Sequence, residues 1–161
     1  MIPFTKISIT DVEKEYINEA LTNSKICGDG VFTKKCNEWF KENCKITNFL
    51  LTTSGTHSLE LAALLAELKA YDEVILPSYT FVSTADAILL RGAKPVFVDI
   101  DKRTLNIDEN LIEERITEKT KAIVPVHYAG VACNMDKIME IAKKHNLIVI
   151  EDAAQGVLAY Y

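Results

Sequence analysis

The stretch Leu147-Ile-Val-Ile-Glu-Asp-Ala-Ala-Gln155 joins four consecutive aliphatic residues to two carboxylates that follow directly. A short, continuous apolar run of this kind is typical of a strand buried on both faces of a parallel sheet. Similar runs recur earlier in the chain, between segments whose apolar residues have helical spacing. Strands that alternate with helices in this way predict right-handed βαβ units and an α/β fold.

The same two patterns predict the remaining elements. Short apolar runs predict strands at 49–51, 74–76, 95–100, 122–126 and 147–150. Helical spacing predicts helices over 10–24, 33–44, 56–69, 80–90, 108–116 and 135–145. Because the first part of the chain contains only helices, we divide it into an amino-terminal helical arm, residues 1–45, and an α/β part, residues 46–161.

Composition narrows the class of protein. The 161 residues are 48% hydrophobic and 25% charged, with a net charge of −5, which argues against a disordered or collagen-like chain. The acidic balance gives no electrostatic reason to expect nucleic acid or an anionic membrane as a partner. The sequence shows no secretory signal, no apolar run of ~20 residues and no metal-binding motif. We therefore expect a cytoplasmic protein with four reduced cysteines and no bound metal.

The segment Thr52-Thr-Ser-Gly-Thr56 lies where an expected strand ends and the next helix begins. The first N–H groups of a helix are unpaired and lie at the positive end of its dipole, which suits a phosphate group. Gly55 allows close approach of the backbone, and Thr56 adds a hydroxyl. The alternative is an ordinary helix cap with a glycine turn.

Other strand ends carry groups that suit an aromatic ligand. Asp152 follows the strand at 147–150, where its carboxylate could pair with a protonated ring nitrogen, and Gln155 could donate an amide hydrogen bond. The alternative for Asp152 is a capping carboxylate. Tyr79 or Phe81 could lie over an aromatic ring or pack in the core. His127, beside Tyr128 at a third strand end, is a hydrogen-bonded structural residue more often than a base.

Taken together, the strand ends offer a phosphate-binding helix start, an aromatic side chain and a carboxylate. This set fits a flat, phosphorylated, nitrogen-containing ring, and pyridoxal 5′-phosphate (PLP) is the cofactor with that structure. Its chemistry as an electron sink requires the ring nitrogen to stay protonated, which an aspartate partner favours.

Six motifs in order along the chain resemble the DegT/DnrJ/EryC1/StrS sugar aminotransferases. They are Ser-Gly-Thr-x-Ser-Leu at 54–59, Pro-Ser-x-Thr-Phe-Val-Ser-Thr at 77–84, Gly-Ala-Lys-Pro-Val-Phe-Val-Asp-Ile at 92–100, Thr-x-Asn-Ile-Asp at 104–108, Pro-Val-His-Tyr-Ala-Gly at 125–130 and Glu-Asp-Ala-Ala-Gln at 151–155. Ile2-Pro-Phe, Cys27-Gly-Asp-Gly and Phe32-Thr are similar to the dTDP-4-amino-4,6-dideoxygalactose transaminase branch.

The resemblance implies a fold-type I, PLP-dependent transferase with an aspartate aminotransferase-like large domain, acting as a homodimer. Such an enzyme moves an amino group from an amino acid, usually glutamate, to a dTDP-4-keto-6-deoxy sugar in polysaccharide biosynthesis. Carried over by motif, Gly55 and Thr56 hold the phosphate, Phe81 stacks on the ring, Asp152 pairs with its nitrogen and Gln155 contacts its 3′-oxygen. The alternatives are a sugar dehydratase of the same family and a non-catalytic scaffold.

In the family the Schiff-base lysine follows the aspartate motif, so we expect it beyond Tyr161 and assign no catalytic residue here. This residue also separates aminotransferases from dehydratases, which carry histidine instead. The family's strand order places two later strands between 49–51 and 147–150, so the sheet formed by this sequence would have a gap of roughly 10–15 Å. We expect strand 49–51 to lose its pairing, to rearrange or to be covered by another copy.

Overall fold

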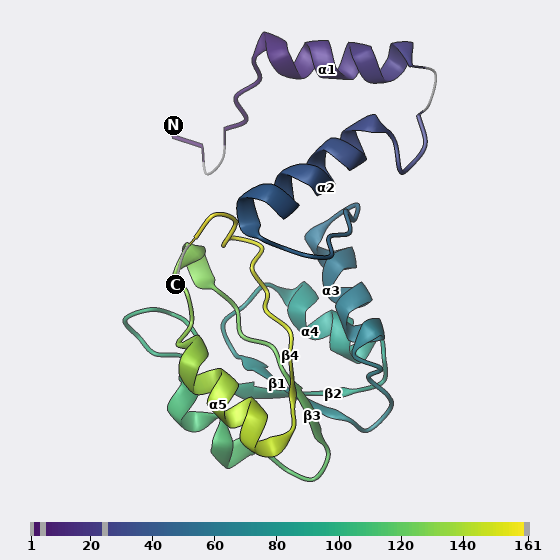
Figure 1. Cartoon of the computed structure of the whole chain (residues 1–161). Helices are drawn as coiled ribbons and strands as arrows, with labels where there is room; N and C mark the ends of the chain where they lie inside the picture. Colours follow the sequence, from purple (N-terminus) through teal and green to yellow (C-terminus); the bar gives the residue numbers. More distant parts are fainter. Residues whose placement is uncertain (1, 4–5, 24–25, 160–161) are drawn as a thin grey trace. The chain divides into compact units, whose positions relative to one another are not determined.

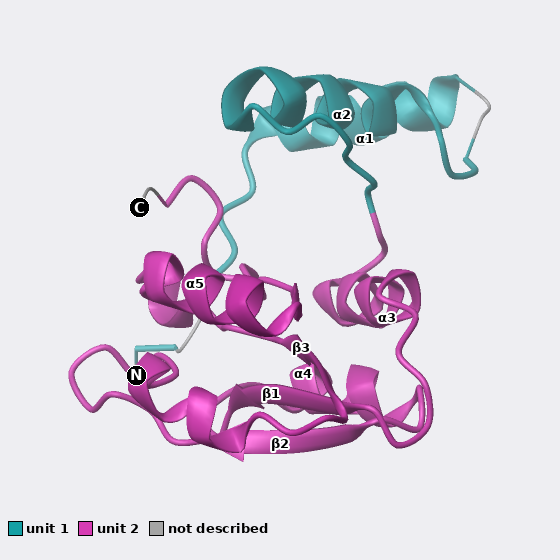
Figure 2. Cartoon of the chain, turned by 60° about the horizontal axis from the view of Figure 1, so that its bottom comes forward, with its two compact units in different colours: residues 1–51 teal, residues 52–161 magenta. Residues whose placement is uncertain are grey.

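The computed structural model describes residues 2–3, 6–23 and 26–159. The chain forms two compact units, residues 1–51 and residues 52–161, which are coloured separately in Figure 2. No helix in the described ranges is long and apolar enough to cross a membrane. The four cysteines are all free thiols.

The first unit contains two helices, α1 (Asp11–Thr22) and α2 (Val31–Cys44). A capping box between Thr10 and Glu13 starts α1. The rings of Tyr16 and Phe32 lie 5.3 Å apart and join the two helices, yet no residue of either helix is buried. Both helices predicted from the sequence are therefore confirmed, except that the end expected for the first at residue 24 lies outside the described residues.

The second unit is built on a four-stranded parallel sheet (Figure 1). Its strands are β1 (Glu73–Pro77), β2 (Lys94–Val98), β3 (Thr120–Ile123) and β4 (Ile148–Val149), in the spatial order β2-β1-β3-β4. Every pairing is parallel, and the order requires crossover connections between the strands. The predicted α/β fold with a parallel sheet is confirmed.

The core lies on both faces of β1, all five residues of which are buried. Val74 and Leu76 pack into a cluster with residues of α3 (Gly55–Leu65) and α4 (Val82–Leu89). Ile75 packs into a second cluster with residues of α5 (Met135–His145). Side chains alternate between the faces of a strand, so the continuous apolar run of β1 separates two helical layers.

Two predicted elements are wrong. The segment 108–116 forms two short 3₁₀ turns, η1 (Glu109–Leu111) and η2 (Glu113–Arg115), instead of a helix. These turns bring Ile112 fully into the core beside Ile107, and short 3₁₀ turns are common as connectors. The segment 49–51 forms no strand, because a strand needs a hydrogen-bonded neighbour and none of the described strands pairs with it. Of the three outcomes expected for segment 49–51, the structure shows the loss of strand pairing.

Glu113 links η2 to the end of α5 and should make stability depend on pH. Its Oε1 lies 2.8 Å from His145 Nε2 and 2.6 Å from Lys144 Nζ. These hydrogen bonds lower the pKa of the Glu113 carboxyl from 4.5 to about 2. The carboxylate therefore stabilises the fold fully above about pH 4.5, and its contribution is lost as the pH falls to about 2.

We expect Glu113→Gln to lower the free energy of unfolding at pH 7, and the difference from the unsubstituted chain to shrink between pH 4.5 and pH 2. Urea unfolding across this pH range measures it. Glu114→Gln is the matched control, because Glu114 is an exposed neighbour on the same turn. A difference that stays constant with pH would contradict the assignment.

Candidate cofactor site

The backbone pairing of β3 and β4 continues beyond the regular strands. Asp152 N–H donates to the Pro125 carbonyl at 2.9 Å, and His127 N–H donates to the Asp152 carbonyl at 3.1 Å. Val126 and Asp152 thereby form a parallel bridge. This extension places Asp152 beside Val126 at the carboxyl edge of the sheet, where ligands bind in open α/β folds.

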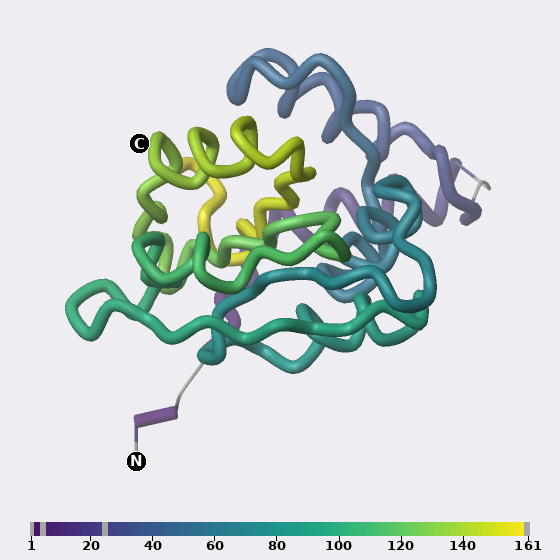
Figure 3. Tube along the Cα trace, turned by 90° about the horizontal axis from the view of Figure 1, so that it is seen from below, coloured from purple at the N-terminus to yellow at the C-terminus, as the bar shows by residue number. Residues whose placement is uncertain are grey.

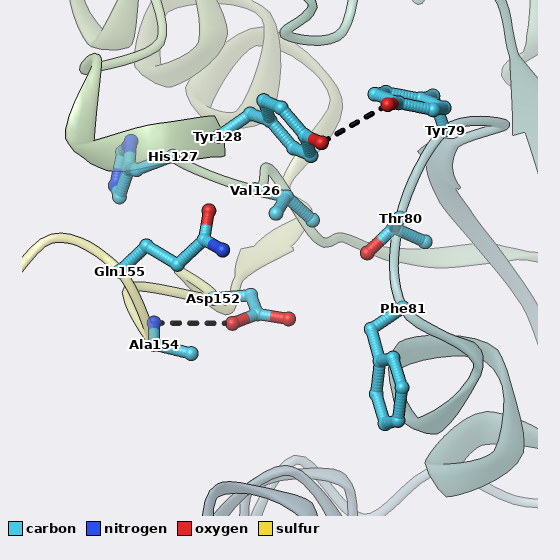
Figure 4. A pocket seen from close by; sticks show the side chains of 9 residues that line it. All are labelled: Tyr79, Thr80, Phe81, Val126, His127, Tyr128, Asp152, Ala154 and Gln155. Atoms are coloured by element: carbon cyan, nitrogen blue, oxygen red, sulfur yellow. Dashed lines mark hydrogen bonds between the residues drawn. The ribbon is translucent and has the colours of Figure 1, made fainter. Parts of the chain in front are cut away.

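A pocket of about 310 Å³ opens at this edge (Figure 4). The segments that follow β1, β3 and β4 supply its walls, and its floor and sides mix aromatic with polar groups. The lining residues are Tyr79, Thr80, Phe81, Val126, His127, Tyr128, Asp152, Ala154 and Gln155. Three of the five residues predicted for a cofactor, Phe81, Asp152 and Gln155, therefore share one cavity.

Asp152 is buried and accepts hydrogen bonds on both carboxylate oxygens. Thr84 Oγ1 donates to Oδ2 at 2.8 Å, and the Ala154 N–H donates to Oδ1 at 3.3 Å. No ion pair among the described residues includes Asp152. A buried carboxylate without a cation is costly, and each oxygen can still accept a further hydrogen bond. The pocket is therefore suited to a cationic N–H group.

Phe81 directly precedes α4, and 73% of its surface is exposed, which rules out the core-packing alternative for this residue. In the view of Figure 4 the Asp152 carboxylate lies between the Phe81 and Gln155 side chains. Gln155 Oε1 accepts from the Ala129 N–H at 2.6 Å. Because its carbonyl is engaged, the amide NH₂ of Gln155 remains as a donor for the pocket.

Gly55 and Thr56 begin α3, and neither is among the residues that line this pocket. Ser54 caps the helix by accepting from the His57 N–H at 3.2 Å. The N–H groups of Gly55 and Thr56 have no intrahelical acceptor, as in the first turn of any helix. A Cβ on Gly55 would have no heavy atom within 4 Å, so the space next to this backbone is open.

His127 is held on both ring nitrogens. Its Nδ1 accepts from the Cys133 N–H at 3.1 Å, so Nε2 carries the proton and donates to Glu151 Oε2 at 2.9 Å. This arrangement agrees with the interpretation of His127 as a hydrogen-bonded structural residue. The hydroxyl groups of Tyr79 and Tyr128, both in the pocket lining, form a hydrogen bond of 3.0 Å. This hydrogen bond raises the pKa of Tyr128.

Sequence reasoning gave no role to Thr84 or Asn106, two buried polar residues that hydrogen-bond to Asp152 and Tyr128 of the pocket lining. Thr84 lies four positions after Thr80, and the two hydroxyls are 2.9 Å apart on one face of the helix start. This i, i+4 threonine pair at a strand end was the available signal. Asn106 bonds to residues 22 and 25 positions away, so no local pattern could have shown its role.

Comparisons with known proteins agree with this geometry. Residues 8–161 match the model of the DegT/DnrJ/EryC1/StrS aminotransferase family. The chain belongs to this family. It is 41% identical over 149 residues to the GDP-perosamine synthase of Caulobacter vibrioides and 40% identical over 160 residues to that of Escherichia coli O157:H7. These matches cover 92% and 99% of the chain, and 40% and 44% of the two relatives.

A solved structure, NtdA from Bacillus subtilis with the bound cofactor pyridoxamine 5′-phosphate (PMP), is 36% identical to this chain and matches it with a TM-score of 0.87. The match covers 92% of this chain and 35% of that structure. The chain thus spans less than half the length of these relatives and has the fold of part of the large domain of PLP-dependent aminotransferases. The comparisons support the family and its cofactor, whereas the names of the two synthases refer to GDP and do not single out the dTDP branch.

The Thr84–Asp152 hydrogen bond should contribute to stability. Thr84→Val keeps the shape of the side chain but leaves a buried carboxylate oxygen without its donor, which costs about 1–3 kcal/mol. Urea unfolding measures this loss. In an Asp152→Ala background the same substitution should cost much less, because the acceptor is gone. Equal losses in both backgrounds would show that the hydrogen bond is not the cause.

Proposed function

We propose that this chain provides the ring-binding part of the PLP site of a sugar aminotransferase. The observation that carries the proposal is the buried Asp152 carboxylate, which faces a pocket and has no cationic partner among the described residues. A protonated pyridine nitrogen is a flat cationic donor that fits this position. The exposed ring of Phe81 supplies a matching aromatic face.

Each of the predicted residues then has a distinct task. Asp152 accepts a hydrogen bond from the protonated ring nitrogen, Phe81 stacks on the ring, and the Gln155 amide donates a hydrogen bond to the 3′-oxygen of the ring. Gly55 and Thr56 hold the phosphate with their first-turn N–H groups. Thr84 and the Ala154 N–H keep the Asp152 carboxylate oriented toward the pocket.

The bound cofactor supplies an electron sink for amino-group transfer. The residues of this chain make that chemistry possible by orienting the ring and by keeping a proton at its nitrogen. A negative charge in a buried site favours the protonated nitrogen because water does not screen it there. The hydrogen bonds to both Asp152 oxygens fix the direction of the carboxylate.

We extend the proposal to the substrates. The enzyme transfers an amino group from an amino acid, glutamate in the first instance, to a nucleotide-linked 4-keto-6-deoxy sugar. The motifs near the amino terminus favour dTDP as the nucleotide, and the two GDP-perosamine synthases favour GDP. The homodimer implied by the family resemblance, and the cytoplasmic location expected from the cysteines and the lack of a secretory signal, are part of the same proposal.

The cofactor role is tested by titrating the chain with PMP in a calorimeter. Asp152→Asn removes the charge and keeps the size, so we expect affinity to fall at least about tenfold, since a hydrogen bond to a charged group contributes ~1.5–3 kcal/mol. Asp86→Asn is the matched control, because Asp86 is exposed on α4. Equal affinity of the Asp152→Asn variant and the unsubstituted chain would overturn the role.

The substrate is tested in the enzyme that contains this chain. Incubation with glutamate and either a dTDP-linked or a GDP-linked 4-keto-6-deoxy sugar should yield one amino sugar, detected by its mass. Product from the dTDP sugar alone supports the branch indicated by the sequence motifs. Product from the GDP sugar alone contradicts that branch and supports the substrate type named in the relatives.

A further inference from the structure

The turn η3 (Tyr128–Gly130), which follows β3, holds two successive residues in the left-handed region. Ala129 has φ 52° and ψ 24°, and Gly130 has φ 79°. Glycine adopts this conformation at no steric cost, whereas alanine does not. A strained turn of this kind persists only where the surrounding structure holds it in place.

Asn106 spans the turn with both ends of its side-chain amide. Its Oδ1 accepts from the Tyr128 N–H at 2.9 Å, and its Nδ2 donates to the Val131 carbonyl at 3.0 Å. Only 3% of Asn106 is exposed, so both hydrogen bonds are shielded from water. One buried side chain therefore fixes the start of the turn and the residue that follows it.

Asn106 is itself held firmly, in the loop between β2 and η1. Figure 3 traces this segment of the chain in the teal-green part of its colour bar. Its carbonyl accepts from the Asp101 N–H at 2.9 Å. The neighbouring Ile107 forms an antiparallel bridge with Ile100 and is 1% exposed. The side-chain amide of Asn106 thus projects from a hairpin anchored in the core, which makes it a rigid support for the turn.

The turn reaches the pocket through Gln155. The Ala129 N–H donates to Gln155 Oε1 at 2.6 Å, and a Cβ on Gly130 would lie 3.0 Å from the backbone carbonyl oxygen of Gln155. A backbone N–H can only donate, so the oxygen of the Gln155 amide must face the turn. The NH₂ group is then the end that is left for the pocket.

We propose that Asn106 is a positioning residue that sets which end of the Gln155 amide faces the ligand. It holds the turn in the left-handed conformation, the turn aims the Ala129 N–H at the Gln155 carbonyl, and Gln155 presents its NH₂ donor to the pocket. The identity of the ligand rests on the function proposed above, but the coupling between Asn106, the turn and Gln155 exists in the free chain.

The coupling in the free chain is tested by NMR. With Asn106→Ala, we expect the Ala129 amide to exchange with solvent at least about tenfold faster and the side-chain NH₂ resonances of Gln155 to shift. Asn110→Ala, an exposed asparagine four residues away, should change neither. If Asn106→Ala does not fold, Asn106→Asp retains the acceptor for Tyr128 N–H and serves instead. Unchanged Ala129 exchange and Gln155 resonances in a folded Asn106 variant would overturn the proposal.

The consequence for the ligand is tested by a double-mutant cycle with PMP. Asn106→Ala and Gln155→Ala should each weaken PMP binding by about tenfold, and the double variant should lose about tenfold in total, since both act through one hydrogen bond. Losses that multiply would show that Asn106 does not act through Gln155. Failure of the unsubstituted chain to bind PMP would count against the proposed function, and the NMR result would then decide the coupling by itself.

Discussion

The burial of one carboxylate without a cation is the constraint on which the site depends. Removing a charge from water is expensive, and Asp152 recovers part of that cost from Thr84 Oγ1 and the Ala154 N–H. Neither donor carries a charge, so the carboxylate keeps a strong preference for a cationic ligand. A cationic donor in the pocket would offset this imbalance.

The sheet determines where this carboxylate lies. Aliphatic residues on both faces of β1 and β3 form the two core clusters, and polar residues begin where those runs end. The parallel pairing of β3 and β4 continues to the Val126–Asp152 bridge, which fixes the position of the carboxylate relative to the wall formed by His127 and Tyr128. The same extension brings the η3 turn beside Gln155.

Local patterns predicted most of this arrangement, because strand and helix signals are carried by neighbouring residues. The helix at 135–145 and the buried strands were readable from periodicity, and the rule that ligands bind at the carboxyl ends of parallel strands brought Phe81, Asp152 and Gln155 together. The segment 108–116 has helical spacing, but it forms two 3₁₀ turns, and Ile112 between them lies in the second core cluster.

Local sequence patterns could not predict the contacts between residues far apart in the chain. Thr84 and Asp152 are 68 residues apart, and Asn106 bonds across 22 and 25 positions, so only the folded chain shows what these side chains hold. The sequence pattern at 49–51 was that of a strand, but a strand also needs a partner, and none of the described strands supplies one. The segment's propensity therefore did not decide its structure.

The most direct test of the central claim is the protonation state of the ring nitrogen when PMP is bound. ¹⁵N NMR of PMP labelled at the pyridine nitrogen reports it across a pH titration. The account predicts that the nitrogen bound to this chain stays protonated to a higher pH than in free PMP, and that Asp152→Asn abolishes the difference. A bound nitrogen that titrates as in free PMP, or one unaffected by Asp152→Asn, would contradict it.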